Sequence, residues 1–487
     1  FLKYADFSHY ADYFNGMEDE NIVQAIPNEK ASEWMEENIP LFECPQHNFE
    51  EMYYYRWWSL RKHIKETPVG YGMTEFLVQR SYSDKYNLIA CAIGHHIYES
   101  RWLRDPKYLD QIIHTWYRGN DGGPMKKMDK FSSWNADAVL ARYMVDGDKD
   151  YLLDMKKDLE TEYQRWERTN RLKNGLYWQG DVQDGMEESI SGGRRKKYAR
   201  PTINSYMYGN AKALSCIGIL SGDEGMAMKY GMRADTLKNL VENELWNTRH
   251  QFFETMRTDS SANVREAIGY IPWYFNLPDT TQKYEIAWKE IMDEKGFSAP
   301  YGLTTAERRH PEFRTRGVGK CEWDGAIWPF ASAQTLTAMA NFMNNYPQTV
   351  LSDSVYFRQM ELYVESQYHR GRPYIGEYLD EVTGYWLKGD QERSRYYNHS
   401  TFNDLIITGL IGLRPRLDNT IEVNPLIPAD KWDWFCLDNV LYHGHNLTIL
   451  WDKNGDRYHC GKGLRIFVDG KEVGQANTLT KIVCENA

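Results

Sequence analysis

Glu377 is the carboxylate whose surroundings indicate chemistry most clearly. It lies in YIGEYLDEVTGYWLKGDQERSRYYNH, residues 374–399, which is crowded with aromatic rings and leads into an apolar run. A sugar ring stacks its apolar face on aromatic side chains and offers hydroxyls to charged and amide partners. A solvated surface loop with ordinary tyrosine content is the alternative interpretation. We expect a carbohydrate site in which Glu377 is the reactive group.

A second acidic loop could supply a partner carboxyl. GLYWQGDVQDGMEESISGG, residues 175–193, places Asp184 and Glu187 among aromatic and glycine residues. A carboxyl held against aromatic rings loses hydration, which raises its pKa and lets it donate a proton near neutral pH. A calcium loop is the competing interpretation, but the ligand alternation and central glycine of an EF-hand are missing. We expect Glu187 to be a general acid, with Asp184 as the alternative acid.

Aromatic and polar residues also gather where helices should begin. CEWDGAIWPF at 321–330, YYYRWW at 53–58 and FSSWNADAV at 131–139 each mix rings with hydrogen-bonding groups. Each cluster also has a structural interpretation: a helix cap with packing tryptophans, or a surface ion pair. The residues that we expect to contact sugar are Arg56, Trp57, Trp134, Asp137, Asn204, Trp323, Asp324, Trp328, Tyr378 and His399.

Helical patterns recur from about residue 50 to 412 and pair naturally into six hairpins. Acidic turns precede the outer helix of several pairs, whereas the second helices are apolar on most faces, as helices buried on both sides should be. Long polar and aromatic loops precede these inner helices, which is where a site is expected. The predicted pairs are 50–64 with 84–102, 107–117 with 132–146, 149–170 with 203–220, 223–245 with 262–275, 280–294 with 324–343, and 353–369 with 400–412.

The pattern changes at about residue 413. TIEVNPL, LTILWD and LRIFVDG alternate apolar and polar residues between turns, which indicates short antiparallel strands. We expect an N-terminal extension at 1–45, a helical catalytic domain at 46–412 and a small β-sandwich at 413–487.

Composition narrows the classes of partner and cofactor. The formal net charge of -11 argues against nonspecific binding to nucleic acid. No run approaches the roughly 20 apolar residues that a membrane span needs. The sequence begins without Met or a leader, so export is permitted, and we expect a periplasmic or secreted protein. The seven cysteines lack metal-ligand spacing, so neither a metal nor a cofactor is expected.

The order of these motifs resembles inverting glycoside hydrolases of the (α/α)6-barrel group, which includes trehalases, processing α-glucosidases and mannosylglycerate hydrolases. Bacterial families acting on arabinofuranosyl or other pectic sugars are also similar. The acid loop departs from the group, because a Trp-Asp pair is replaced by Met186-Glu187. The residues that carry the resemblance are Gly185, Met186, Glu187 and Asn204 in the acid loop, Trp323, Gly325 and Trp328 in a W-x-G-x-x-W motif, and Glu377, Tyr378, Gly384 and Phe402 in the base segment.

The resemblance implies a mainly α fold, an (α/α)6 toroid of six helical hairpins with a small C-terminal β-sandwich. It implies exo-acting hydrolysis of an oligosaccharide or polysaccharide, with Glu187 as acid and Glu377 as base. For inversion, the two carboxyl groups should lie roughly 6.5 to 9.5 Å apart. Two other classes stay open here. A polysaccharide lyase or sugar epimerase could use His399 with nearby Tyr and Arg side chains, and a glycan-binding protein would need only the aromatics.

Overall fold

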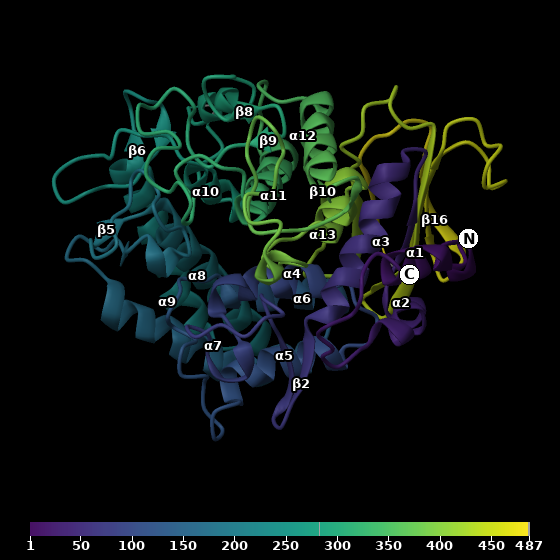
Figure 1. Ribbon diagram of the computed structural model, residues 1–487, viewed down its shortest axis with the longest axis horizontal. Helices are drawn as coiled ribbons and strands as arrows, with labels where there is room; N and C mark the ends of the chain where they lie inside the picture. Colours follow the sequence, from purple (N-terminus) through teal and green to yellow (C-terminus); the bar gives the residue numbers. More distant parts are fainter. Residues whose placement is uncertain (282, 486–487) are drawn as a thin grey trace.

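The computed structural model describes residues 1–281 and 283–485. Helices are the main regular structure before residue 411, and long loops join them (Figure 1). No helix in these described residues is both long and apolar enough to cross a membrane. The α-helices are α1 (Ser8–Asn15), α2 (Ala31–Asn38), α3 (His47–Lys62), α4 (Ile93–Ser100), α5 (Lys107–Arg118), α6 (Asn135–Asp146), α7 (Lys149–Asn170), α8 (Pro201–Ser221), α9 (Glu224–Leu240), α10 (Ile271–Tyr274), α11 (Pro329–Asn345), α12 (Asp353–Ser366) and α13 (Asn403–Leu405).

Six of these helices contact one another in a closed circle. Helix α4 contacts α6, α6 contacts α8, α8 contacts α10, α10 contacts α11, α11 contacts α13, and α13 returns to α4. Their residues are buried on most sides, and α8 and α11 each begin with a proline, whose missing N–H costs nothing in a first turn. Among the other helices, α3, α7, α9 and α12 contact members of this circle. The circle places the loops before its helices in reach of one another.

Several predicted helices are shorter than their patterns suggested. The expected helix at 262–275 is a 3-10 helix, Ala267–Tyr270, followed by the four-residue α10. Pro272 is tolerated in the first turn of α10 but could not stand inside one continuous helix through this segment. The one at 280–294 is a 3-10 helix, Glu285–Ile291, and residue 282 lies outside the described residues. The one at 400–412 is α13 followed by a π-helix, Ile406–Leu410. By contrast, α7 has the predicted bounds.

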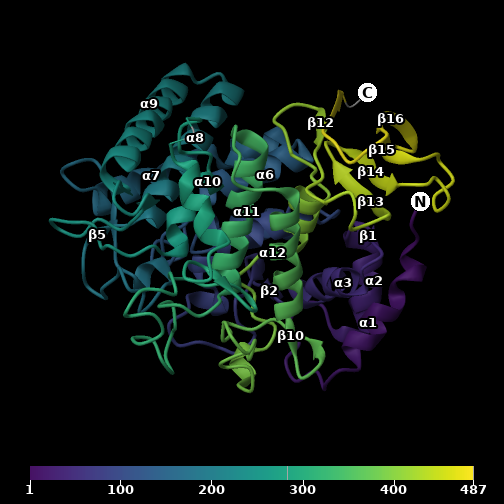
Figure 2. The ribbon, with the colours of Figure 1, turned by 90° about the horizontal axis from the view of Figure 1, so that it is seen from above.

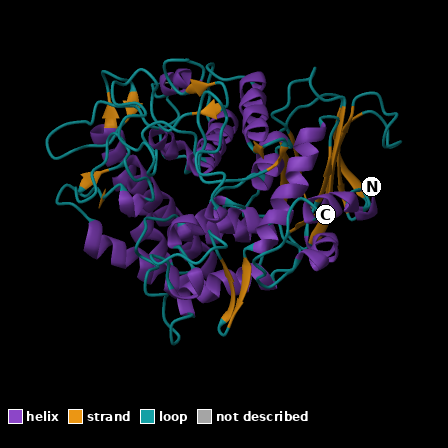
Figure 3. Cartoon of the chain, in the orientation of Figure 1, coloured by secondary structure: helices purple, strands orange, loops and turns teal. Residues whose placement is uncertain are grey.

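The C-terminal region is a sheet that recruits a strand from far upstream. Strands β13 (Trp434–Tyr442), β14 (His445–Asp452), β15 (Gly463–Val468) and β16 (Lys471–Ala476) pair antiparallel. Strand β1 (Leu41–Glu43), from the predicted N-terminal extension, pairs antiparallel with β13 at the sheet edge. Strands β12 (Thr420–Val423) and β17 (Ile482–Glu485) form a separate pair. Figures 2 and 3 show this strand-rich region beside the N terminus.

Short hairpins shape the loops between helices (Figure 3). Each pair has two to four residues per strand. The pairs add backbone hydrogen bonds to the loops but do not form a second large sheet. They frame the segments that carry the predicted acid and base. The pairs are β2 (Ile64–Thr67) with β3 (Gly70–Met73), β4 (Trp178–Gln179) with β5 (Tyr198–Ala199), β6 (Trp246–Asn247) with β7 (Phe252–Phe253), β8 (Ser298–Ala299) with β9 (Gly302–Leu303), and β10 (Tyr368–His369) with β11 (Arg372–Pro373).

Candidate active site

Glu377 is held four residues after β11 by backbone and charge. Leu379 exchanges backbone hydrogen bonds with Ile327 (3.0 and 2.9 Å), which fixes this segment beside the start of α11. The Glu377 side chain is buried, and its Oε2 lies 2.9 Å from Arg393 Nη2 and 3.4 Å from Lys388 Nζ. These two charged contacts fix the orientation of the Glu377 carboxyl group.

Glu187 has the opposite electrostatic environment. Gly185, with φ 72°, lies so close to Cys91 that a Cβ would approach Sγ to 2.5 Å, so glycine lets the acid loop pack on the segment before α4. Burial raises the pKa of Glu187 to about 7, and the negative charge of nearby Glu377 adds to the rise. Glu187 therefore keeps a proton at near-neutral pH that it can donate.

The structure adds a third carboxyl, Glu75, that sequence reasoning missed. It follows β3, where Asn398 donates from its backbone N–H to the Glu75 carbonyl (3.0 Å). Its Oε2 is buried without a partner among the described residues. Burial raises the pKa of Glu75 to about 8, and the charges of Glu377 and Glu187 raise it further. In the sequence, one Glu in MTEFLVQ looks like any solvated loop residue, so only its burial identifies it.

Glu75 should make folding stability depend on pH. Its folded pKa exceeds the ordinary 4.5, so the folded state holds this proton more tightly, and the stability contribution is lost as pH rises from 4.5 through about 8. We expect Glu75→Gln, which does not titrate, to match the wild type at pH 4 and to be about 1 to 3 kcal/mol more stable at pH 8. Denaturant unfolding at both pH values measures this. Glu66→Gln, on the same hairpin and exposed, is the control, and an equal gain at pH 4 would contradict the titration.

Three stacked rings form a wall next to Glu377. The Tyr378 ring lies 4.5 Å from Trp328 at 19°, and Trp328 lies 4.4 Å from Trp323 at 20°. The Tyr378 hydroxyl donates to the Lys320 carbonyl (2.7 Å), which fixes the end of the stack. These three predicted residues are therefore brought together beside the carboxyl groups.

Buried polar atoms without protein partners lie near this wall. Both ring nitrogens of His399 and His95, and the Nε1 atoms of Trp134 and Trp323, have none among the described residues. Burial lowers the pKa of His95 to about 3 and that of His399 well below its usual value, so both rings are neutral. The His95 ring lies 5.0 Å from Trp134. Since buried polar groups normally find partners, sugar hydroxyls are suitable ligands for these atoms.

Asp184, the predicted alternative acid, is hydrogen-bonded to other side chains inside the protein. Its Oδ2 lies 2.6 Å from Arg200 Nε, and both side chains are fully buried. The hydroxyls of Thr202 and Ser132 also donate to its carboxylate. These contacts anchor the acid loop to the start of α8.

Three predicted sugar contacts also have structural roles. Arg56 donates to Gln367 Oε1 (2.7 Å) and to the Ser400 carbonyl (2.8 Å), so it positions the segment after His399. Asn204 bonds both backbone groups of Tyr177 (2.8 and 2.9 Å). Trp57 is fully buried in α3 against Tyr53. Arg56 and Asn204 therefore hold neighbouring segments in position, and Trp57 packs in the core.

Two acidic residues predicted to contact sugar, Asp137 and Asp324, are hydrogen-bonded to other groups of the protein. Asp137 accepts a hydrogen bond from the Tyr98 hydroxyl (2.6 Å), and burial raises its pKa to about 6. Asp324 does not cap α11. Its Oδ2 accepts from the backbone N–H groups of Arg316 (2.6 Å) and Gly317 (2.9 Å), while Oδ1 is buried without a partner among the described residues. Asp324 therefore shapes the loop ahead of the aromatic wall.

A carboxyl of raised pKa and a second carboxyl paired with two cations, beside stacked rings and neutral histidines, are the side chains that a glycoside hydrolase needs. Comparison with known proteins gives the same class. Residues 85–400 match the domain described as mannosylglycerate hydrolase MGH1-like glycoside hydrolase, and residues 413–474 match the C-terminal domain of glycosyl hydrolase family 65. The chain therefore belongs to the family of MGH1-like glycoside hydrolase domains.

Solved structures show the same fold. One named "Sialidase" is 95% identical with a TM-score of 0.99 and matches 100% of this chain, but the chain spans only 45% of its length. A GH63 mannosylglycerate hydrolase from Thermus thermophilus, in complex with glucose, is 13% identical with a TM-score of 0.54 over 73% of this chain and 99% of its own. A GH78 family rhamnosidase from a Bacillus species is 10% identical with a TM-score of 0.58 over 88% of this chain and 41% of its own.

Proposed function

We propose that this chain hydrolyses a glycosidic bond with inversion, using Glu187 as general acid and Glu377 as general base. The observation that carries the proposal is the contrast between the two carboxyls. Burial raises the pKa of Glu187 to about 7, whereas the Glu377 carboxyl lies 2.9 Å from Arg393 and 3.4 Å from Lys388. Two carboxyls whose environments push their protonation apart are the usual basis for assigning an acid and a base.

The proposed reaction proceeds in one displacement. Glu187 gives its proton to the oxygen that leaves, while Glu377 takes a proton from a water molecule that attacks the anomeric carbon from the opposite face. The C–O bond to the leaving group breaks as the new C–O bond forms. The outer face of an end ring of this stack, Tyr378 or Trp323, would pack on the sugar and hold the anomeric carbon between the two carboxyls.

We further propose the (α/α)6 toroid as the scaffold, supported by the closed circle of contacts among α4, α6, α8, α10, α11 and α13. Buried unpartnered atoms on His95 and His399 favour a closed chamber that admits the end of a chain, and hence exo action on an oligosaccharide. The names of similar proteins suggest sugars to test: mannosylglycerate, rhamnosides and sialosides. A periplasmic or secreted location is part of the proposal.

Product analysis by proton NMR tests the reaction directly. We expect one panel of plant and bacterial oligosaccharides, with the three sugars above, to contain a substrate that releases a terminal sugar whose first-formed anomer is inverted. The anomeric proton signal is followed from the first minutes, before mutarotation. Retention of configuration, or an unsaturated product that absorbs in the ultraviolet, would exclude the proposed mechanism, and the latter would favour a lyase.

A further inference from the structure

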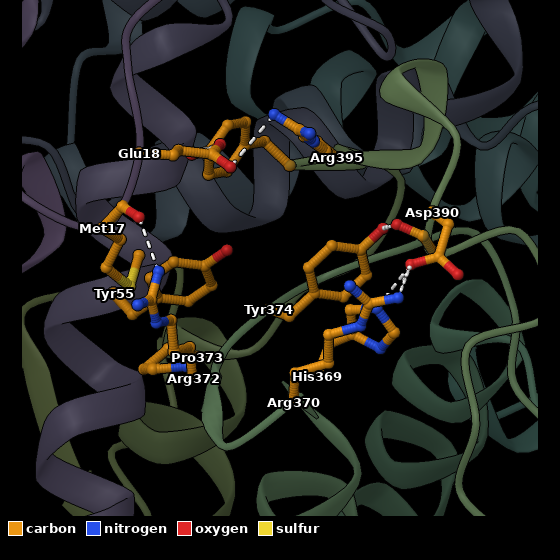
Figure 4. Close-up of a pocket in the computed structure, with 12 residues that line it drawn as sticks. Met17, Glu18, Tyr55, His369, Arg370, Arg372, Pro373, Tyr374, Asp390 and Arg395 are labelled. Atoms are coloured by element: carbon orange, nitrogen blue, oxygen red, sulfur yellow. Dashed lines mark hydrogen bonds and ion pairs between the residues drawn. The ribbon is translucent and has the colours of Figure 1, made fainter.

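A large cavity lies beside the Glu377 segment and is not lined by any of the three carboxyls described above. Its volume is ≈580 Å³, which is in the range of small-molecule sites. Figure 4 shows Tyr55 and Tyr374 on opposite sides of the opening, with Glu18 and Arg395 across one end. Aromatic rings with charged groups between them suit a sugar ring. Other lining residues include His369, Arg370, Arg372, Pro373, Asp390 and Tyr396.

The cavity has one more cationic group than its carboxylates can pair. Arg395 pairs with Glu18 (3.0 Å), and Arg370 pairs with Asp390 (2.7 Å). In contrast, the Arg372 guanidinium donates to the Met17 carbonyl (2.7 Å) and has no carboxylate partner among the described residues. A guanidinium offers five donors in a fixed fork that matches a carboxylate. In a chain of net charge -11, this local cation is suited to an anionic ligand.

The segments around residues 374–377 and 388–395 contribute both to the cavity and to the surroundings of the proposed base, Glu377. Tyr374 lines the cavity, and Glu377 follows three residues later. Gly389 and Arg395 line it as well, while Lys388 and Arg393 of the same loop contact Glu377 (3.4 and 2.9 Å). A glycan bound in the cavity would therefore be adjacent to the reaction centre.

We propose that this cavity is a second carbohydrate site, which binds a uronic acid unit of the glycan through Arg372. The carboxylate accepts hydrogen bonds from the guanidinium, and the sugar ring lies between Tyr55 and Tyr374. This site goes beyond the hydrolysis proposed above, and binding there does not depend on which carboxyl is acid or base. It would give the enzyme a preference for acidic polysaccharides.

Calorimetric titration of the full chain carrying Glu377→Gln, which prevents turnover, tests the site. The probes are digalacturonate, diglucuronate and neutral cellobiose. We expect at least one uronate disaccharide to bind and cellobiose to bind more weakly. Arg372→Gln should weaken uronate binding about tenfold, the value of one charged hydrogen bond, and Arg372→Lys should restore part of it.

Arg358→Gln is the matched control, because it removes the same charge from an exposed position on α12 outside the cavity. Circular dichroism checks that each variant is folded. The proposal is overturned if neither uronate binds, if cellobiose binds as tightly, or if Arg372→Gln and Arg358→Gln give the same affinity. Equal affinities of these two variants would mean that uronate binds outside this cavity, for example at the reaction centre. The proposed hydrolysis is tested separately, by the product analysis described above.

Discussion

Glu377→Gln lowers kcat by about 10²- to 10⁴-fold on every substrate, because the attacking water loses the group that accepts its proton. Glutamine keeps the size of the side chain and one oxygen, so substrate binding changes little and the loss is mainly in kcat. The loss should not depend on the leaving group, since Glu377 acts on the water. Steady-state kinetics with aryl and natural glycosides measure both parameters.

Glu392→Gln is the control for this variant. Glu392 is exposed in the same loop as Arg393 and lies outside the proposed reaction centre. We expect wild-type kinetics from it. Near-normal kcat in Glu377→Gln would remove Glu377 from the mechanism, whatever the behaviour of the control.

Glu187→Gln produces a loss that depends on the leaving group. Natural sugar leaving groups need protonation, so we expect kcat to fall about 10²- to 10⁴-fold with oligosaccharides. An aryl glycoside with an acidic phenol departs without help and should lose far less. The ratio of the two losses, measured with a series of phenols of different pKa, distinguishes an acid from a residue that only stabilises the site.

The pH profile gives a second reading of Glu187. With a pKa raised to about 7, the wild type should lose activity as pH rises through 7, because the acid loses its proton. Glu187→Gln should lose that alkaline limb with an aryl substrate. Glu188→Gln, the neighbouring carboxyl paired with Arg194 (2.7 Å), should retain it. An unchanged alkaline limb in Glu187→Gln would assign the titration to another group, and Glu75 would be the first to test.

The long helices were predictable because their signal is local. Asp148 caps α7 through a bond to the Tyr151 N–H (2.9 Å), and an acidic turn of that kind is readable in the sequence. The short segments around α10 and α13 were overestimated, because apolar runs alone do not reveal a 3-10 or π-helical turn. The division at residues 45 and 412 stays a prediction.

Some features of the candidate site could also be predicted from local sequence, whereas others depend on tertiary contacts. The Glu377 segment and the W-x-G-x-x-W motif could be recognised from their aromatic composition, and their rings stack in the structure. Which carboxyls are buried, and beside what, depends on contacts between distant loops. Asp184 contacts Arg200 and Glu75 contacts Asn398 only in the folded chain, so the sequence could not show these partners, and Glu75 was not among the predicted residues.

The pairing of β1 with β13 joins residues nearly 400 positions apart, Leu41 with Asp438. The sheet is therefore completed only after almost the whole chain has been synthesised, and contacts of such long sequence separation form slowly. By pairing with β13, the three residues of β1 hold the segment that precedes the helical region against the sheet that follows it. A fragment cut between the helices and the sheet would expose a bare strand edge on one piece and an unpaired strand on the other, and both are sources of aggregation.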